Sequence, residues 1–388
     1  MRYFLLAGEA SGDNLGALLA KAIRARDPEA EFAFWGGASL EAATGLAPKQ
    51  HIRDLAFMGF VEVVANLPTI LRLIRAAKAD VAAFAPDVLV CIDYPGFNLR
   101  LARWAKRRGI RVDFYVSPQI WAWRRSRVHR VVADTDRVLC VLPFEPAFYR
   151  AYGYEVDYTG HPLPARVDAY RAPGAIDVQL GGGRSERLAG GALALLPGSR
   201  AQEVRRQLAT MAAAARLLRE RDPEHSLRPV IAAAPVLRDG DLDAIARDFG
   251  VGYHRDAYAV LSHAELACVS SGTATLETAL FGVPQVVAYR GGALSVAIAR
   301  RVIRVEHIAL VNLILGEAVV PELIQTDFTP ERVAEALTRL AAPPERERVR
   351  ARYARVREAL EPYDAAGAAA DLIVADARAA RDVSHRPR

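Results

Sequence analysis

Several short segments of this 388-residue chain place polar side chains directly after an apolar, strand-like run. Asp93 follows the run Asp87–Ile92, and residues 8–13, Gly-Glu-Ala-Ser-Gly-Asp, follow the first such run of the chain. Ligands of doubly wound sheets bind beyond the carboxyl ends of the strands. Asp93 is therefore either a turn or capping residue or a general base. Ser11 and Asp13 likewise either cap the next helix or contact a ligand.

A third segment, residues 115–124, reads Tyr-Val-Ser-Pro-Gln-Ile-Trp-Ala-Trp-Arg and also follows a strand-like run. Aromatic side chains usually belong to a core. Here Gln119, Trp121 and Arg124 fall on one loop, and that grouping favours the wall of a sugar or phosphate pocket.

The second half of the chain contains two junctions in which a strand-like run meets a helix through small residues. The first is Leu-Pro-Gly-Ser-Arg, residues 196–200, and the second is Ser-Ser-Gly-Thr-Ala-Thr-Leu-Glu, residues 270–277. Helix starts of this kind bind anions. Arg200 is either a solvated surface residue or a charge that stabilises a departing phosphate. Glu277 either interacts with the helix dipole or holds a ribose diol. Since no Walker or GxGxxG motif occurs, the two junctions indicate a nucleoside diphosphate bound by main chain and arginine.

The elements that must position these residues form two series of strand-like runs separated by amphipathic helical stretches. The alternation predicts parallel sheets with crossover helices, and the two series predict two doubly wound, Rossmann-like α/β domains. We place the first domain at residues 1–170 and the second at 190–344. The Gly- and Pro-rich stretch 171–191 is expected to be a linker or surface loop. A final helical stretch, about residues 345–380, could pack back on the first domain.

Composition narrows the class of protein. Hydrophobic residues make up 52% and charged residues 25%, as in ordinary globular proteins. The three cysteines are widely separated in apolar runs, and no His or Cys spacing suggests a metal; we expect no metal and no cofactor. No segment is apolar for long enough to be a signal or a membrane span, which predicts a cytoplasmic protein. The net charge of +6 suits an anionic partner.

The ordered set of motifs resembles the lipid-A-disaccharide synthase family, over about residues 1–340. The matching motifs are GEASGD (8–13), MGFVEV (58–63), DYPGFN (93–98), YVSPQIWAWR (115–124), LPFEPAFY (142–149), GHPL (160–163), LPGSRAQEV (196–204), SGTATLE (271–277) and VPELIQ (320–325). The resemblance implies a GT-B glycosyltransferase, with two Rossmann-like domains facing across a cleft. It implies a reaction of UDP-2,3-diacylglucosamine with 2,3-diacylglucosamine 1-phosphate (lipid X) that gives the β-1,6 disaccharide 1-phosphate and UDP, with inversion.

The same resemblance assigns roles to residues of this chain. Asp93 would be the base for the acceptor 6-hydroxyl, and Arg200 would stabilise the leaving diphosphate. The donor site would comprise Ser199, Arg200, Ser271, Gly272, Thr273, Glu277, Asn312, Glu322 and Gln325. The acceptor side would comprise Ser11, Gln119, Trp121 and Arg124. The chain departs from the family pattern at Val311, where a proline usually precedes the asparagine, in the longer Gly-rich stretch near 181–191, and in its tail beyond about Leu360.

Acylated substrates require contact with a bilayer surface. Apolar residues recur at helical spacing between residues 60 and 74, with cations nearby and a proline at 68 that should kink the helix or start a new one. Such a helix either faces the core or inserts into an anionic interface. We expect membrane contact by Val61, Val64, Leu67, Ile70, Leu71 and Ile74, and a peripheral position on the inner face of the cell membrane. A homodimer is compatible with the sequence.

Three other functions were weighed. A UDP-sugar 2-epimerase or soluble glycosyltransferase keeps the fold and changes the chemistry. A basic RNA- or membrane-binding module is compatible with the arginines between 100 and 130, but no aromatic RNA motif accompanies them, so we expect no nucleic acid partner. A serine hydrolase built on Ser11 and His161 lacks a GxSxG elbow.

Overall fold

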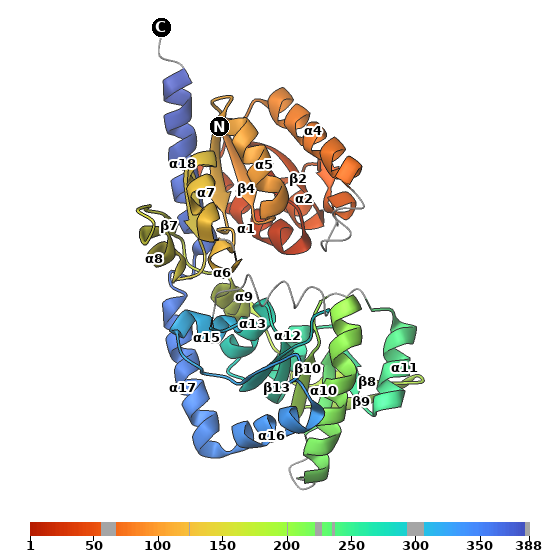
Figure 1. The fold of residues 1–388 in the computed structure, drawn as a ribbon. Helices are drawn as coiled ribbons and strands as arrows, with labels where there is room; N and C mark the ends of the chain where they lie inside the picture. Colours follow the sequence, from red (N-terminus) through yellow and green to blue (C-terminus); the bar gives the residue numbers. More distant parts are fainter. Residues whose placement is uncertain are drawn as a thin grey trace. The chain divides into compact units, whose positions relative to one another are not determined.

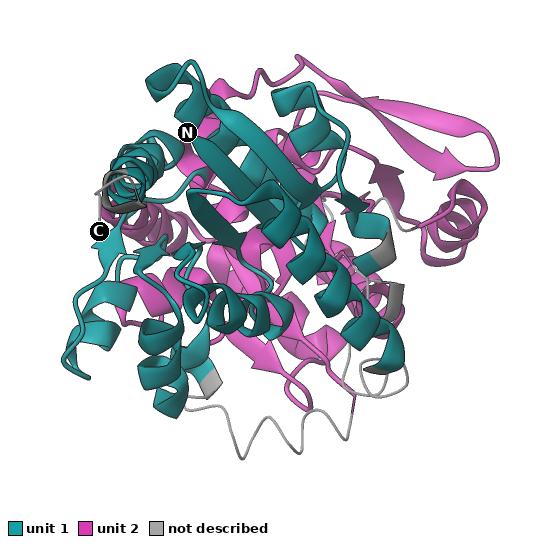
Figure 2. Cartoon of the chain, turned by 90° about the horizontal axis from the view of Figure 1, so that it is seen from above, with its two compact units in different colours: residues 1–162, 360–388 teal, residues 163–359 magenta. Residues whose placement is uncertain are grey.

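The computed structural model of the chain describes residues 1–55, 67–123, 125–199, 201–221, 227–234, 237–292 and 306–384. The chain divides into two compact units, residues 1–162 with 360–388 and residues 163–359 (Figure 2). Each unit is built around one sheet that helices cover, which confirms the predicted α/β class. Within the described ranges, no helix combines the length and the apolar character needed to cross a bilayer.

The first unit contains a parallel sheet, which has seven strands among the described residues, in the order β3-β2-β1-β4-β5-β6-β7. The strands are β1 (Arg2–Ala7), β2 (Glu31–Gly36), β3 (Gln50–His51), β4 (Val88–Ile92), β5 (Arg111–Tyr115), β6 (Arg137–Cys140) and β7 (Asp157–Tyr158). The order reverses direction between β1 and β4, which is where ligands of such sheets bind. The segments 8–13 and 93–98 leave the sheet at this point.

Helices cover both faces of this sheet (Figure 1). The helices of the unit are α1 (Ala10–Arg26), α2 (Ala38–Thr44), α4 (Leu67–Phe84), α5 (Pro95–Lys106), α6 (Ile120–Trp123), α7 (Val128–Asp134), α8 (Glu145–Arg150) and α18 (Ala365–Ser384), with short 3-10 turns at Ile52–Leu55 and Arg125–Arg127. Buried residues of α4 and α5 pack on one face of the sheet. On the other face α18 packs along α1 and contacts β4 and β5.

Charged pairs hold α18 against the first unit. Asp376 on α18 accepts hydrogen bonds from Arg137 on β6, at 2.6 and 3.0 Å, and lies 2.7 Å from a guanidinium nitrogen of Arg111 on β5. Asp371, one turn earlier, pairs with Arg26 of α1 at 2.5 Å. The last helix of the chain is therefore part of the first unit, as the contact division also assigns it.

The second unit contains a mixed sheet, with eight strands in the described part of the chain, in the order β15-β14-β13-β10-β11-β12-β8-β9. Its strands are β8 (Ile176–Gly181), β9 (Arg184–Leu188), β10 (Ala192–Leu196), β11 (Arg228–Ala232), β12 (Gly252–His254), β13 (Ala264–Ser270), β14 (Gln285–Tyr289) and β15 (Glu322–Ile324). Its helices are α9 (Leu163–Ala169), α10 (Ala201–Arg221), α11 (Asp239–Phe249), α12 (Ala257–Ser262), α13 (Thr273–Leu280), α15 (Leu310–Leu315), α16 (Pro330–Ala341) and α17 (Pro343–Ala359).

The stretch 171–191 differs from expectation. It is not a linker: β8 and β9 form an antiparallel hairpin, and β8 pairs with β12 to extend the second sheet at its edge. Gly181, Gly182 and Gly183 at its turn all have positive φ, which only glycine adopts readily. The glycines that suggested a flexible loop thus form the tight turn of a hairpin, and the hairpin belongs to the second unit.

Candidate functional site

In the first unit, the turn after β1 places Glu9 and Ser11 at the switch point of the sheet. Ser11 Oγ donates a hydrogen bond to Glu9 Oε1 at 3.0 Å. Gly8 lies directly against the ring of Tyr94, where a Cβ atom would stand 2.2 Å from a ring carbon. Only glycine therefore allows this close approach of the turn after β1 to the turn after β4.

Asp13 and Ser11 do not cap the helix on which they lie. No side chain caps the start of α1, whose N-cap residue is Glu9. The buried Asp13 carboxylate instead accepts hydrogen bonds from the N–H groups of Gly37, at 2.6 Å, and Ser39, at 2.9 Å, at the start of α2. Asp13 thus stabilises the neighbouring helix. Ser11 is exposed, and its hydroxyl oxygen can still accept a hydrogen bond from a ligand while its proton is donated to Glu9.

Asp93 lies in a turn of unusual backbone conformation. Asp93 and Tyr94 have φ values of +47° and +49°, in the left-handed region that non-glycine residues rarely adopt. The turn is held by the Asp93 N–H, which donates to Tyr115 O at 2.9 Å, and by Asn98 Nδ2, which donates to Asp93 O at 2.7 Å. Strained turns that surrounding contacts fix in this way occur at functional sites.

The Asp93 carboxyl group has the acid–base properties of a general base. Burial raises its pKa, and the neighbouring carboxylate of Glu9 contributes through charge repulsion and a hydrogen bond, so that the pKa is about 6. A base with a pKa just below neutral is ionised at pH 7 and still takes up a proton readily. Glu9 was not among the predicted site residues. Its position in the GEASGD motif, directly after the first strand, is the sequence feature that could have identified it.

The loop with Gln119 and Trp121 is partly a core structure. Gln119 is exposed, but Trp121 is 6% exposed and its indole N–H donates to Glu145 Oε1 at 3.1 Å. Glu145 also accepts from the Leu142 N–H at 3.1 Å, and burial raises its pKa to about 7. Trp121 is therefore an anchor that fixes the loop, so Gln119 is the described residue of this set that is free to face a ligand. Arg124 lies outside the described residues.

The predicted membrane residues separate into buried and exposed positions. Val61 and Val64 lie outside the described residues, as does the side chain of Leu67, the first residue of α4. Ile70 and Ile74 are less than 10% exposed and pack in the core of the unit, so they do not face a membrane. Leu71 is 45% exposed. Pro68, expected to kink a helix or to start a new one, is the second residue of α4, and the residues before Leu67 lie outside the described part of the chain.

In the second unit, the turn after β13 begins α13. Ser271 Oγ donates to Ile308 O at 2.9 Å, Gly272 has a φ of +152°, and both Gly272 and Thr273 are exposed. No side chain caps α13. The first N–H groups of this helix lack intrahelical partners and carry the positive end of its dipole, an arrangement that binds phosphate.

Glu277 lies one turn further along α13, half-buried. Its Oε1 accepts a hydrogen bond from Tyr258 OH at 2.8 Å. The other segment predicted to bind phosphate includes the exposed Ser199. Arg200, which is expected to stabilise the leaving group, lies outside the described residues. Gln207 of α10 joins the turns after β10 and β13, because its Nε2 donates to Pro197 O at 3.2 Å and Ser270 Oγ at 2.9 Å.

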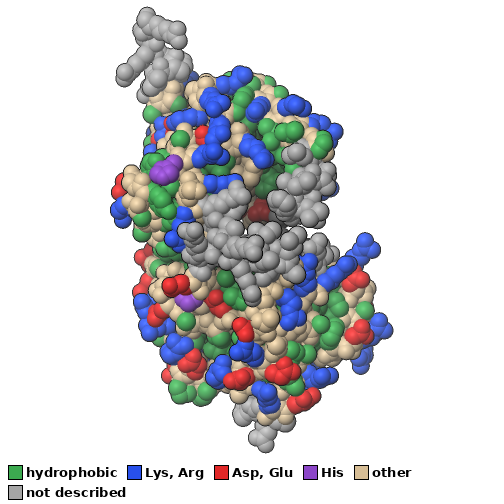
Figure 3. Space-filling view, viewed as in Figure 1, with side chains coloured by type: hydrophobic (Ala, Val, Ile, Leu, Met, Phe, Trp, Pro, Cys, Tyr) green, Lys and Arg blue, Asp and Glu red, His purple; other side chains and the backbone are tan. Residues whose placement is uncertain are grey.

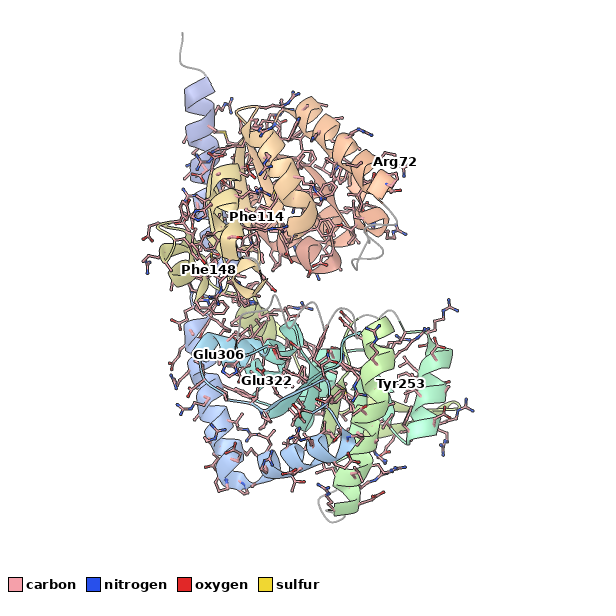
Figure 4. The ribbon with its side chains drawn as sticks, viewed as in Figure 1. Arg72, Phe114, Phe148, Tyr253, Glu306 and Glu322 are labelled. Carbon is pink, nitrogen blue, oxygen red and sulfur yellow. The ribbon has the colours of Figure 1, made fainter. Side chains whose placement is uncertain are left out.

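Asn312 and Glu322 are occupied by hydrogen bonds inside the protein. The fully buried Asn312 donates to Val320 O at 2.9 Å and Glu322 Oε1 at 2.8 Å, and it accepts from the N–H groups of Val319 and Val320. Glu322 (Figure 4) also accepts from the N–H groups of Ile308 at 3.0 Å and Ala309 at 2.9 Å. The pair thus fixes the loop at 307–309.

Gln325 follows β15 at the carboxyl edge of the sheet. Its φ is +57°, and its N–H donates to Tyr289 O at 2.9 Å, next to the end of β14. Ser271, Ile308 and Gln325 thus lie along one edge. Tyr258 was not among the predicted site residues. No motif in the sequence marks it, because its role depends on a contact with Glu277, which lies 19 residues later on another helix. Within the described residues, no cluster of three metal-ligating side chains occurs.

The chain matches known proteins over almost its whole length. The family model described as lipid-A-disaccharide synthetase matches residues 3–371. Lipid-A-disaccharide synthases of Alkalilimnicola ehrlichii and Syntrophus aciditrophicus are each 41% identical, the first over 97% of this chain and 98% of its own, the second over 92% of both.

Solved structures share the fold at low identity. A glycosyltransferase of kitacinnamycin aligns with a TM-score of 0.65 at 18% identity, covering 97% of this chain and 98% of its own. A UDP-N-acetylglucosamine 2-epimerase of Listeria monocytogenes aligns at 0.60 and 15%, covering 100% and 98%. MurG of Acinetobacter baumannii aligns at 0.55 and 14%, covering 96% and 98%. These likenesses concern the GT-B fold, which both transferases and epimerases use.

Proposed function

The chain belongs to the lipid-A-disaccharide synthase family of glycosyltransferases, and we propose that it joins UDP-2,3-diacylglucosamine to lipid X with inversion at the anomeric carbon. The products are the β-1,6 disaccharide 1-phosphate and UDP. The observation that carries this proposal is the Asp93 carboxyl group, half-buried beside Glu9 at the switch point of the first sheet, with a pKa of about 6.

In the proposed reaction, Asp93 takes the proton of the acceptor 6-hydroxyl as that oxygen attacks the anomeric carbon of the donor. The bond between this carbon and the β-phosphate oxygen breaks, and the electron pair leaves with UDP. An ionised base with a pKa near 6 suits this step at neutral pH. Ser11 and Gln119 contribute to acceptor binding, together with Arg124; Trp121 acts by fixing the loop through its bond to Glu145.

The donor is held by the second unit. The uncapped start of α13, with Ser271, Gly272 and Thr273, receives the diphosphate, and Ser199 and Arg200 assist at the other phosphate-binding turn. Glu277 accepts hydrogen bonds from the ribose hydroxyls. Gln325 borders this pocket, while Asn312 and Glu322 shape it through the loop at 307–309.

The acyl chains of both substrates require an encounter with a bilayer, and the first unit offers a basic surface for it. Arg72 and Arg75 on α4, Arg100 on α5, and Arg107 and Arg108 in the turn after α5 are exposed. Figure 3 shows blue Lys and Arg side chains gathered over this unit, and Figure 4 shows Arg72 on the outer side of α4. Exposed cations attract anionic lipid head groups. We infer a peripheral position on the inner face of the cell membrane, with Leu71 as the described apolar residue at the interface; a homodimer is compatible with this position.

The test supplies both acylated substrates in detergent and measures UDP formation and the disaccharide product. Release of UDP together with a β-1,6 disaccharide supports the proposal. Conversion of a soluble UDP-sugar without a lipid acceptor would assign the chain to the epimerase-like enzymes that share its fold. The sequence comparison favours the synthase, because the epimerase likeness is 15% identical and concerns the fold alone.

A further inference from the structure

The strongest unassigned contact lies behind Glu277, where α12 meets α13. Tyr258 OH donates to Glu277 Oε1 at 2.8 Å, and the Tyr258 side chain is only 7% exposed. Glu277 is half-buried, and one of its carboxylate oxygens, Oε1, is hydrogen-bonded within the protein. Within the described residues the other oxygen, Oε2, accepts no side-chain hydrogen bond, and it is the one that can accept from a diol.

The ring of Tyr258 is fixed from three sides. Tyr170 and Phe281 pack edge-on against it, with ring centroids at 5.5 and 5.1 Å, and the Arg166 guanidinium carbon lies 5.1 Å from its centroid. Edge-to-face rings and a cation over a ring are favourable arrangements. The phenol therefore holds one position, and a hydrogen bond from it imposes a position on Glu277.

The start of α12 is fixed as well. The Asp256 carboxylate accepts hydrogen bonds from the N–H groups of Tyr258, at 2.9 Å, and Ala259, at 3.2 Å, and it accepts another from Tyr170 OH at 2.8 Å. This cap joins α12 to the segment after α9. Tyr170 and Tyr258 thus form a matched pair, in which one hydroxyl faces the cap and the other faces Glu277.

The phenol of Tyr258 remains a donor at any physiological pH. Burial raises its pKa, and the carboxylate of Glu277 raises it further, whereas Arg166 acts in the opposite direction. Because the Tyr258 hydroxyl stays protonated, it continues to donate to Glu277 Oε1, and Glu277 Oε2 is left to accept hydrogen bonds from a ligand.

We propose that Tyr258 is a positioning residue for nucleotide recognition, which holds Glu277 in the rotamer that binds the ribose hydroxyls of the uridine donor. This inference rests on the role assigned to Glu277 above. A carboxylate without this bond would have to lose side-chain freedom on binding the ligand, and recognition of the diol would weaken. Recognition of the uracil and of the phosphates would not depend on it.

The experiment compares the binding of UDP and 2′-deoxy-UDP to the full chain by calorimetry. Loss of a hydrogen bond to a charged group corresponds to about tenfold in affinity, so the wild type should prefer UDP by about that factor. Tyr258→Phe keeps the aromatic packing and removes the hydroxyl. It should reduce the preference to about threefold or less, while affinity for 2′-deoxy-UDP changes less than about twofold.

Tyr170→Phe is the matched control, because it removes a hydroxyl from the same aromatic cluster without touching Glu277. It should leave the preference for UDP unchanged. An equal loss of affinity for both nucleotides in Tyr258→Phe would mean a merely structural role and would overturn the inference. Glu277→Gln tests the ribose role of Glu277 separately from the positioning role of Tyr258. If this variant keeps the wild-type preference for UDP, Glu277 does not bind the ribose, and the positioning role of Tyr258 is wrong as well.

Discussion

The indole N–H of Trp121 donates a 3.1 Å hydrogen bond to Glu145, a carboxylate buried at the start of α8. The bond joins the loop after β5 to the turn after β6, because Glu145 also accepts from the Leu142 N–H. Trp121, which the sequence suggested as the wall of a binding pocket, is thus a buried anchor. It fixes the position of the exposed part of its loop.

Burial of the Glu145 carboxyl group predicts an unusual dependence of stability on pH. Burial raises the pKa of Glu145 from 4.5 to about 7, so the folded state disfavours its ionised form. The unfolded chain loses the proton near the ordinary pKa, and the free energy of unfolding therefore falls as pH rises from about 4.5 to about 7. The loss amounts to roughly 3 kcal/mol.

Glu145→Gln removes the titration. The free energy of unfolding, measured by urea denaturation across this pH range, should fall with pH more steeply in the wild type than in the variant. The exposed Glu155, changed to Gln, is the control and should leave the wild-type slope unchanged. Parallel curves for wild type and Glu145→Gln would show that the buried carboxyl group does not titrate in this range.

The pair of carboxyl groups at the switch point predicts a pH profile for catalysis. Asp93 must be ionised to act as a base, so kcat/KM should rise with pH through about 6. Glu9→Gln removes the charge repulsion that helps raise this pKa, and the acid limb should move to lower pH. Asp93→Asn should lose about 10²- to 10⁴-fold in kcat, the size expected for general-base catalysis.

Rates of UDP release measured across pH check both variants. Glu41→Gln, an exposed carboxylate on α2, is the control and should leave the acid limb in place. Retention of full activity by Asp93→Asn would remove it as the base. An unmoved limb in Glu9→Gln would show that burial alone sets the pKa.

Several of the parallel strands were predictable because they are short apolar runs that are buried on both faces. The predicted run Asp87–Ile92, for example, differs from β4 (Val88–Ile92) by one residue. The hairpin at β8 and β9 was missed because it lies at a sheet edge, where alternate residues face water and the apolar signal is weak. The glycines of this stretch then dominate its sequence pattern and suggest a loop.

The candidate site could be located in the sequence but not resolved into roles. Residue types after each strand pointed to Asp93 and to the turn at Ser271–Thr273, because strand ends converge on one edge. Whether a polar side chain faces a ligand or the protein depends on tertiary partners. Asn312 is the clearest case, since all four of its hydrogen bonds are made inside the second unit.

Asn312 therefore predicts a loss of stability before a loss of chemistry. Asn312→Ala leaves the N–H and the carbonyl oxygen of Val320 without their side-chain partner, whereas the Val319 N–H keeps Glu317 O and Glu322 Oε1 keeps the N–H groups of Ile308 and Ala309. Each buried unsatisfied group costs about 1–3 kcal/mol, and we expect a total on the order of 3 kcal/mol in urea denaturation. Glu322→Gln keeps one acceptor oxygen and should cost less. A stable Asn312→Ala protein with greatly weakened UDP binding would indicate direct contact with the donor instead.

The two kinds of apolar residue on α4 give the sharpest test of membrane docking. Leu71 is 45% exposed between cations, whereas Ile74, three residues later, is 6% exposed in the core. An exposed leucine inserted into the interface contributes buried apolar area, and the cations add attraction to anionic lipid. Leu71→Ser should reduce binding to vesicles containing anionic lipid by several-fold, with an unchanged melting temperature.

Leu18 on α1 is the matched control, because it is 44% exposed and belongs to the same unit. Leu18→Ser should retain wild-type binding in vesicle sedimentation. Ile74→Ser should lower the melting temperature, since it places a hydroxyl among buried apolar side chains. If Leu71→Ser and Leu18→Ser sediment alike, α4 does not meet the bilayer, and the basic surface around it attracts the lipid substrates by charge alone.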